Sequence, residues 1–331
     1  MKVLLAHTPQ MRRDYYGERS LNGLRAVAEV KLHEGDDALD AKGLVDAARD
    51  VEIIVADRMT QGPGEIFPLL PKLRAFVRCA VDIRNIDVAA ASAAGVLVTR
   101  ASPGFIQSVA ELAVGFMVDL SRGVSRATAD YHAGRAPEVT MGRQLAGSRL
   151  GIIGYGSIGR YLADIAKVLG MEILVADPFV TISDAAIQHV PLDDLLARAD
   201  YVVCLAIANE QTENLIGQAA LARMQPHAFF INLSRGNLVD EAALAAALRE
   251  NRIAGAALDV GRAPDQMPTP ELARLPNVIA TPHVGGLTPQ AIEHQSAETV
   301  RQVAAIVRGE APVGAVNADC WTRRPLAKEN S

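Results

Sequence analysis

The architecture of this chain is indicated by one glycine-rich segment, Leu150-Gly151-Ile152-Ile153-Gly154-Tyr155-Gly156-Ser157-Ile158-Gly159. Its glycine pattern, GxGxxG, follows an apolar run and precedes a segment with apolar residues at helical spacing. A strand, a tight turn and a helix in this order open a Rossmann fold, where the three glycines serve the turn, the approach of a pyrophosphate and the packing of the helix on the strand. We therefore expect a dinucleotide to contact Gly154, Tyr155, Gly156, Ser157, Ile158 and Gly159.

The next predicted strand ends in Asp177, about 20 residues after the glycines. A carboxylate at this place accepts hydrogen bonds from an adenosine ribose and repels a 2′-phosphate, which favours NAD over NADP as the cofactor. The alternative is a glycine-rich turn in which Asp177 only caps the following loop.

Short apolar runs alternate with helix-period segments almost throughout the chain, which is typical of an α/β protein with parallel sheets. Six strand candidates suit a complete Rossmann sheet: Leu150–Ile153, Glu172–Ala176, Tyr201–Ile207, Ala228–Leu233, Ala256–Val260 and Val278–Thr281. Earlier candidates predict a smaller doubly wound domain: Val3–His7, Val27–His33, Val51–Ala56, Leu73–Cys79 and Val96–Thr99. Four further segments complete the prediction. Ile106–Ser121 and Gln290–Val307 are interpreted as crossover helices, Ala129–Ala146 as an irregular excursion, and Asn317–Ser331 as a tail on the surface or on a partner subunit.

The composition excludes several other classes of protein. Half of the 331 residues are apolar, 21% are charged and the net charge is -5, which predicts a globular chain without a nucleic-acid partner. The longest apolar run, Tyr201–Ala208, has eight residues against the roughly 18 that span a bilayer, and the first residues lack a signal-length apolar stretch, so we expect no membrane segment and no export signal. Cys79, Cys204 and Cys320 lack metal-ligand spacing, which predicts no metal site and favours a reducing cytoplasm.

Polar residues follow three of the predicted strands at their carboxyl ends, where ligands of open α/β sheets bind. These residues are Arg235, Asp259 and His283. An arginine fork suits a carboxylate, and a histidine with a pKa near its ordinary 6.5 passes a proton to or from an oxygen on C2 while a hydride moves. Together they predict hydride transfer on a 2-oxo acid.

These motifs resemble the D-isomer-specific 2-hydroxyacid dehydrogenases, from about Val51 to Val307. The resemblance is carried by Gly154–Gly159 with Asp177, Asn232–Asp240, Leu258–Val260 and Leu275–His283. It implies that Arg235 binds and polarises the 2-oxo acid, that His283 is the acid/base, and that Asp259 holds the nicotinamide carboxamide. It also implies that an NAD-binding domain, 102–287, is inserted into a discontinuous flavodoxin-like substrate domain, 1–101 and 288–331, and that a homodimer forms through the cofactor domain with a contribution from Ile106–Arg122.

Two departures from the family pattern bear on catalysis. The family's glutamate five residues beyond Asp259, which pairs with the histidine, is replaced by Pro264; Asp265 takes its place if the loop shifts, and otherwise is an exposed loop residue. In the loop that binds the substrate carboxylate, through the amides of Val81 and Asp82, Asp82 replaces a glycine and adds repulsion. Ala206 and Ala208 also replace a frequent histidine and proline, which leaves the cofactor contact there to the backbone.

Several residues keep two interpretations. Arg58 and Arg100 either bind a distal anionic group of the substrate or are solvated surface arginines. His7 is expected as a hydrogen-bonded structural histidine rather than a cleft residue. The departures also motivate an alternative function, an NAD-binding regulatory or scaffold protein, although a binding module has no chemical need for both Arg235 and His283.

Overall fold

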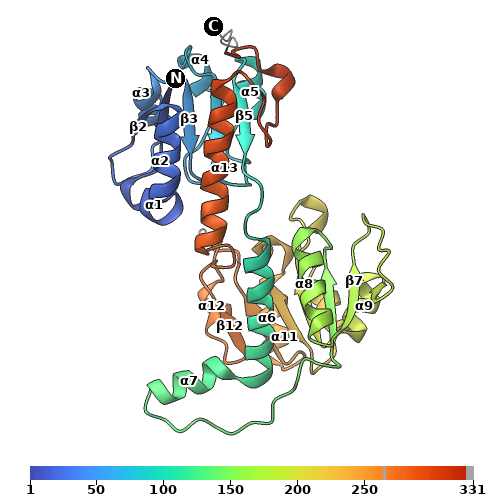
Figure 1. Cartoon of the computed structure of the whole chain (residues 1–331). Coiled ribbons are helices and arrows are strands. Elements are labelled where there is room, and N and C mark those ends of the chain that lie inside the picture. The colour runs from blue at the N-terminus through green and yellow to red at the C-terminus, as the bar shows by residue number, and fades with distance from the viewer. Residues whose placement is uncertain (264–265, 326–331) are drawn as a thin grey trace. The chain divides into compact units, whose positions relative to one another are not determined.

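The computed structural model describes residues 1–263 and 266–325, and the chain divides into two compact units (Figure 1). Unit 1 comprises Met1–Gly104 and Pro289–Ser331, and unit 2 comprises Phe105–Thr288. Each unit is built on a parallel sheet, so the predicted fold class, α/β with two doubly wound domains, is confirmed.

Unit 1 has a five-stranded parallel sheet in the order β2-β1-β3-β4-β5, the flavodoxin-like order. The strands are β1 (Lys2–Leu5), β2 (Glu29–Leu32), β3 (Ile53–Ala56), β4 (Ala75–Arg78) and β5 (Leu97–Arg100). β3 is buried at every position, as a strand covered on both faces must be. Val27, which we expected in a strand, ends helix α2 instead.

Two groups of helices cover the faces of this sheet. Apolar residues of α3 (Ala41–Ala48), α4 (Ile66–Leu69) and α5 (Val88–Ala93) form one core cluster with the sheet. Those of α2 (Glu18–Val27) and α13 (Pro289–Val307), which lie side by side in Figure 1, form the other. A further helix, α1 (Pro9–Tyr15), follows β1.

The chain after α13 packs on unit 1 itself. Trp321 is 6% exposed, belongs to the core beside α2 and α13, and donates from its indole to the Arg74 carbonyl oxygen at 3.0 Å. The Asn317 side chain accepts a hydrogen bond from the Val98 amide at 2.7 Å. The expectation of a tail on the surface or on a partner subunit is therefore wrong for Trp321, because a large apolar ring stabilises the fold most when it is buried.

Unit 2 has a seven-stranded parallel sheet in the order β12-β11-β10-β9-β6-β7-β8. Counted along the chain, its first six strands, β6 to β11, are arranged in the Rossmann order 3-2-1-4-5-6. The strands are β6 (Arg149–Ile153), β7 (Glu172–Ala176), β8 (Ile187–His189), β9 (Tyr201–Cys204), β10 (Phe229–Asn232), β11 (Gly255–Leu258) and β12 (Val278–Ala280). The prediction of six strands is wrong by one, because β8 has three residues of which only Ile187 is buried, too few for a pattern. β9 ends at Cys204 rather than Ile207.

The helices of unit 2 are α6 (Ile106–Arg122), α7 (Val124–His132), α8 (Ser157–Val168), α9 (Leu192–Arg198), α10 (Gln218–Arg223), α11 (Glu241–Arg249) and α12 (Pro270–Ala273). The expected irregular excursion at 129–146 is wrong in its first residues, which complete α7. Gly123, with a φ of 63°, ends α6 and starts α7 in a new direction, so α7 and 133–146 project from the body of unit 2 (Figure 1).

Candidate active site

The glycine turn after β6 leaves open space at the start of α8. Gly154 has a φ of 93°, and a Cβ atom on it would lie 2.6 Å from the Ala206 amide nitrogen. A Cβ atom on Gly159 would collide with the Gly154 carbonyl oxygen, whereas one on Gly156 would meet nothing within 4 Å. Packing therefore requires two of the glycines, and the third leaves the helix N-terminus accessible, which fits the pyrophosphate of a dinucleotide.

Asp177 joins the end of β7 to this turn. Its Oδ2 accepts a hydrogen bond from the Tyr155 amide at 2.7 Å, and its Oδ1 accepts one from the Phe179 amide at 3.0 Å. The second bond is the loop cap that the sequence left as the alternative. The first bond places the negative charge of Asp177 beside the glycine turn. There the carboxylate would accept a hydrogen bond from a ribose hydroxyl and would repel a 2′-phosphate.

Arg235 is held by the loop that follows β10. The buried Asn232 side chain donates to the Arg235 carbonyl oxygen at 3.0 Å and accepts from the Ser234 amide at 3.1 Å. The Arg235 guanidinium is half-buried and donates to the Ser234 carbonyl oxygen at 2.7 Å. A Cβ atom on Gly236 would collide with the backbone of Gly261, so the loops after β10 and β11 are in backbone contact here.

Asp259, 2% exposed at the end of β11, is bonded to the loop that contains His283. Its Oδ1 accepts from the Thr281 hydroxyl at 2.6 Å and the Val284 amide at 2.8 Å, and its Oδ2 accepts from the Gly285 amide at 2.8 Å. These three bonds offset the cost of burying a carboxylate. His283 is half-buried and has a φ of 54°, a left-handed conformation that is uncommon outside glycine.

Parallel strands bring all of these groups to one edge of the sheet. Each of these groups follows the carboxyl end of a strand in unit 2: the glycine turn, Asp177, Arg235, Asp259 and His283. β10, β11 and β12 are consecutive in the sheet, so Arg235, Asp259 and His283 follow neighbouring strands. An arrangement of this kind can hold a dinucleotide and place an arginine and a histidine beside one reacting atom.

The loop after β11 is described on both sides of Pro264 and Asp265, which themselves lie outside the described residues. The Gly261 amide donates to the Gln266 carbonyl oxygen at 2.9 Å, and the Gln266 amide donates to that of Ala263 at 2.7 Å. The pairing of Asp265 with His283 stays a prediction.

Arg262 connects three loops of unit 2, and no sequence signal pointed to it. Its guanidinium donates to the carbonyl oxygen of Val239 at 3.0 Å, to Glu213 at 2.7 Å and to Asn214 at 2.6 Å. The hydrogen bond from Arg262 lowers the pKa of the Glu213 carboxyl below its ordinary value. Arg262 therefore ties the loop after β11, which leads to Asp265, to the loops after β9 and β10.

In unit 1, Asp82 is paired with Arg84, a residue that the sequence did not single out. The Arg84 Nη2 lies 2.6 Å from Oδ2 of Asp82. Hydrogen bonding to the Asp82 side chain raises the pKa of the Arg84 guanidinium. The expected repulsion from Asp82 omitted this cation, because a partner two residues along an irregular loop follows no periodic pattern.

The buried Arg78 at the end of β4 holds two loops of unit 1 together. Its Nη2 donates to the Thr60 carbonyl oxygen at 2.9 Å and to the Asn85 side chain at 2.7 Å, and burial lowers its pKa to about 10. Arg58 and Arg100 are exposed, and their guanidinium groups make no hydrogen bond or ion pair with a residue that the structure describes. Both interpretations of these two arginines stay open.

His7 is buried, as a structural histidine would be, but its Nδ1 atom has no hydrogen-bond partner within the described part of the chain. The expectation of a hydrogen-bonded ring is therefore wrong at this atom. Its ring packs edge-on against Tyr16 at 5.1 Å between centroids, and burial lowers its pKa to about 4, so the ring is neutral near pH 7.

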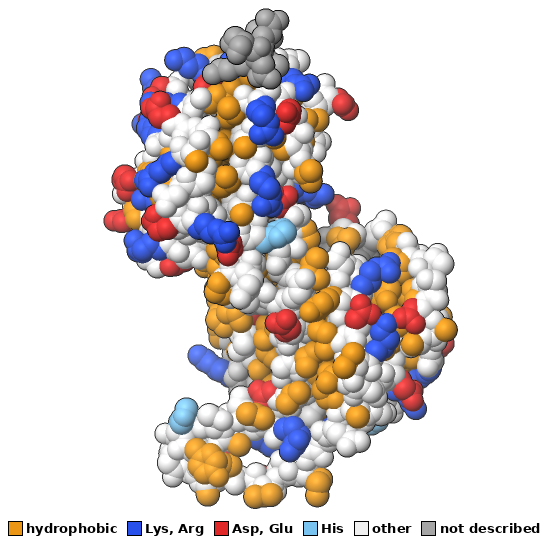
Figure 2. All heavy atoms as spheres, viewed as in Figure 1, with side chains coloured by type: hydrophobic (Ala, Val, Ile, Leu, Met, Phe, Trp, Pro, Cys, Tyr) orange, Lys and Arg blue, Asp and Glu red, His pale blue; other side chains and the backbone are white. Residues whose placement is uncertain are grey.

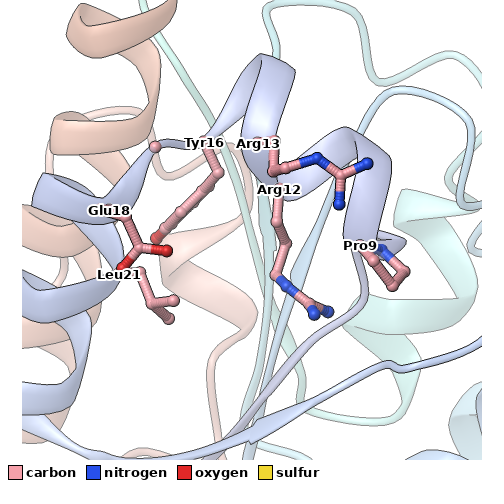
Figure 3. Close-up of a pocket in the computed structure, with 7 residues that line it drawn as sticks. Pro9, Arg12, Arg13, Tyr16, Glu18 and Leu21 are labelled. Atoms are coloured by element: carbon pink, nitrogen blue, oxygen red, sulfur yellow. The ribbon is translucent and has the colours of Figure 1, made fainter.

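A separate pocket of unit 1, about 220 Å³, lies at α1 and the start of α2 (Figure 3). It is lined by Pro9, Arg12, Arg13, Tyr16, Gly17, Glu18 and Leu21. The Arg12 guanidinium is already paired with Glu34 at 2.9 Å. The pocket contains none of the residues that the sequence predicts for the site.

Residues 114–285 match the family model described as D-isomer specific 2-hydroxyacid dehydrogenase, NAD binding domain. The chain belongs to the D-isomer-specific 2-hydroxyacid dehydrogenase family. Its members are NAD-dependent oxidoreductases of 2-hydroxy acids, and unit 2 contains the family's NAD-binding domain.

Three relatives in this dehydrogenase family match most of the chain. The (S)-sulfolactate dehydrogenase of Chromohalobacter salexigens is 37% identical and covers 80% of this chain and 87% of its own. The glyoxylate reductase of Korarchaeum cryptofilum is 31% identical and covers 93% and 95%. The D-3-phosphoglycerate dehydrogenase of Methanocaldococcus jannaschii is 33% identical over 94% of this chain, which spans only 60% of that relative.

Solved structures of the dehydrogenase family share both units. A D-2-hydroxyisocaproate dehydrogenase superimposes with a TM-score of 0.86 at 21% identity, covering 96% of this chain and 100% of that one, and shows the fold alone. The D-lactate dehydrogenase of Lactobacillus jensenii, solved with NAD⁺, gives a TM-score of 0.81 at 25% identity and covers 96% and 99%.

Within 1–263 and 266–325, no group of three or more His, Cys, Asp or Glu residues is arranged to hold a metal ion. No helix in the part of the chain that the structure describes is both long and apolar enough to cross a membrane.

Proposed function

We propose that this protein transfers a hydride between NAD(H) and C2 of a D-2-hydroxy acid or its 2-oxo counterpart. The observation that carries the proposal is the shared sheet edge in unit 2, where the glycine turn, Arg235 and the Asp259-bound loop of His283 follow parallel strands. A binding module would need the glycine turn but not the arginine and the histidine.

Residues of unit 2 hold the cofactor in this proposal. The backbone of Gly154, Tyr155, Gly156, Ser157, Ile158 and Gly159 accommodates the pyrophosphate, and Asp177 accepts from the adenosine ribose. Asp259 bonds the nicotinamide carboxamide in addition to its own loop. The bound cofactor supplies or accepts the hydride.

Arginines and backbone amides bind the acid. The Arg235 guanidinium makes a bidentate contact with the substrate and polarises its C2 carbonyl. The amides of Val81 and Asp82 bind the carboxylate, and Arg58 and Arg100 bind a distal anionic group where the substrate carries one. The protonated ring of His283 gives its proton to the C2 oxygen during reduction and takes it back during oxidation. Asp265 stabilises the charged ring if it lies close enough.

We also propose a homodimer formed through unit 2. Hydrophobic side chains gather over the projecting α7 and 133–146 (Figure 2). Val124 is 53% exposed, Tyr131 71%, Val139 99% and Met141 100%. A surface of this kind on a projecting segment is typical of an interface between subunits.

We propose a cytoplasmic location as well, in line with the three free cysteines.

Steady-state NADH oxidation with a panel of 2-oxo acids, some with a second anionic group, tests the function. We expect turnover with at least one acid, and an Arg235→Ala variant should lose it while NADH binding is retained. Retained NADH binding with no turnover of any acid by the wild type would favour the regulatory or scaffold alternative.

A further inference from the structure

The Ser234 hydroxyl joins the loops that follow β9 and β10. The last residues of the two strands, Cys204 and Asn232, are paired in register, and the Leu233 amide donates to the Cys204 carbonyl oxygen at 3.3 Å. Two residues beyond each strand end, the Ser234 Oγ donates to the Ala206 carbonyl oxygen at 2.5 Å. A carbonyl oxygen only accepts, so the hydroxyl proton is committed to this bond. The side chain thus extends the contact between the two loops past the end of the sheet.

Ala206 is the fixed partner in this bond, because its backbone lies against the glycine turn. A Cβ atom on Gly154 would lie 2.6 Å from the Ala206 amide nitrogen and 2.7 Å from its Cα atom, so the two backbones are in close contact. The preceding residue, Leu205, donates from its amide to the Ile153 carbonyl oxygen at 2.8 Å. Ala206 is therefore held beside the turn that, in the proposed function, accommodates the pyrophosphate.

The backbone of Ser234 is bonded to Arg235. Its carbonyl oxygen accepts from the Arg235 Nη1 at 2.7 Å, which ties one end of the guanidinium to this peptide. The Asn232 side chain accepts from the Ser234 amide and donates to the Arg235 carbonyl oxygen, so the turn is closed on itself. These local bonds fix the shape of the turn, but not its place relative to the neighbouring loops. The close backbone approach of Gly236 to Gly261 fixes that place on the β11 side, and the Ser234 hydroxyl fixes it on the β9 side.

We propose that Ser234 is a positioning residue, whose hydroxyl holds the Arg235 guanidinium at the distance from the cofactor turn that the 2-oxo acid requires. The inference rests on the proposed function, since it assigns a support to the arginine that binds the acid there. Ser234 acts through Arg235 and does not itself bind the acid. A hydroxyl that only stabilised the loop would contribute to the free energy of unfolding and would not depend on Arg235.

The Ser234→Ala variant removes the hydroxyl and keeps the backbone bonds of Ser234 to Asn232 and Arg235. kcat/KM for a 2-oxo acid that the wild type reduces should fall about tenfold, because a small displacement of a group that binds the reacting carbonyl is costly. The affinity for NADH should stay within about twofold of the wild type, since the backbone at Ala206 remains held against Gly154. Steady-state kinetics and fluorescence titration of NADH measure the two effects.

A double-mutant cycle with Arg235→Lys distinguishes positioning from a merely structural role. Lysine keeps the charge but lacks the two-point contact, so these variants are compared by single-turnover rates with enzyme in excess over the acid. Adding Ser234→Ala to Arg235→Lys should lower the rate by less than about twofold, because the guanidinium that Ser234 positions is no longer present. A merely structural hydroxyl would give the same loss in both backgrounds.

Ser148→Ala is the matched control. The Ser148 Oγ also donates to a backbone carbonyl oxygen, that of Gln144 at 3.0 Å. Ser148 precedes β6, so it lies at the opposite end of that strand from the glycine turn. The control variant should have the kcat/KM and the NADH affinity of the wild type, and urea denaturation of both serine variants shows how much stability each hydroxyl contributes.

Calorimetric titration of oxamate, a non-reducible analogue of a 2-oxo acid, into the NADH complex provides a readout without turnover. Oxamate should bind about fivefold more weakly to Ser234→Ala than to the wild type. Unchanged oxamate affinity and kcat/KM in Ser234→Ala, or an equal loss in the Arg235→Lys background, would overturn the inference, and turnover by the wild type would then leave the proposed function standing. No turnover of any acid by the wild type would refute the proposed function and the inference together.

Discussion

The Thr281 hydroxyl donates a hydrogen bond of 2.6 Å to the carboxylate of Asp259. The amides of Val284 and Gly285 donate to the same buried carboxylate, so donors on both sides of His283 converge on one charge. His283 lies between them in a left-handed conformation, which costs free energy that the surrounding contacts must offset. Asp259 is therefore a structural support of the histidine loop, whatever it contributes to the cofactor.

Removing the Thr281 hydroxyl should loosen this loop. Thr281→Val keeps the side-chain shape and deletes one hydrogen bond to a buried charge, so the free energy of unfolding should fall by about 1–3 kcal/mol. kcat/KM should fall with it. Urea denaturation and steady-state kinetics check both, with Thr281→Ser as the control that keeps the hydroxyl. Equal stability of the Val and Ser variants would show that the bond contributes nothing.

The glycines of the turn should fail in different ways when replaced by alanine. Gly159→Ala places a methyl group against the Gly154 carbonyl oxygen, so it should lower the urea midpoint. Gly156→Ala meets nothing within 4 Å in the protein, so it should keep the midpoint but weaken NADH binding by about tenfold, because the methyl occupies the space of the pyrophosphate. Fluorescence titration of NADH measures the affinity. Normal NADH affinity in Gly156→Ala would argue against a pyrophosphate at that place.

Asp177 should set the preference between the two nicotinamide cofactors. Asp177→Asn removes the charge and keeps one acceptor for the Tyr155 amide. The ratio of kcat/KM for NADPH to that for NADH should rise about tenfold or more, because a nearby negative charge no longer repels the 2′-phosphate. The same ratio in variant and wild type would mean that another residue selects the cofactor.

His7 should make the stability of the protein depend on pH. Its pKa is about 4 in the folded chain against 6.5 ordinarily, so between these values the unfolded state binds the proton that the folded state refuses. Stability is full above pH 6.5 and falls by roughly 3 kcal/mol as the pH drops to 4. His7→Gln removes this titration.

Urea denaturation of the wild type and of His7→Gln at pH 4.5 and 7.5 measures the effect of His7. The loss of unfolding free energy between the two pH values should be smaller in the variant. An equal loss in both proteins would assign the acid sensitivity to other groups.

The parts of the fold that the sequence predicted are those with local causes. The glycine turn is set by sterics at Gly154 and Gly159, and buried parallel strands such as β3 read as uninterrupted apolar runs. The chain order of such runs then places Arg235, Asp259 and His283 after neighbouring strands. These residues were found because each directly follows a recognisable element.

The features that the sequence did not predict depend on contacts outside the local sequence pattern. β8 is too short to show a period, and Trp321 becomes a core residue only because β4 and α13 create a place for it. The partners of Arg262 and the carboxylate partner of Arg84 belong to irregular loops, where no periodicity links the residues that meet. Charge networks of this kind depend on three-dimensional contacts and have no signature along the chain.

The transfer of a deuterium label from the cofactor to the substrate distinguishes hydride transfer from cofactor binding alone. NADH with deuterium at both C4 positions is incubated with the enzyme and a 2-oxo acid that it consumes, and the 2-hydroxy acid is analysed by NMR and chiral chromatography. We expect one deuterium at C2 of a product with the D configuration. His283→Asn, which lacks the acid/base ring, should form this product at least about 100-fold more slowly. A product without deuterium at C2, an L product, or an undiminished rate in His283→Asn would contradict the proposed reaction.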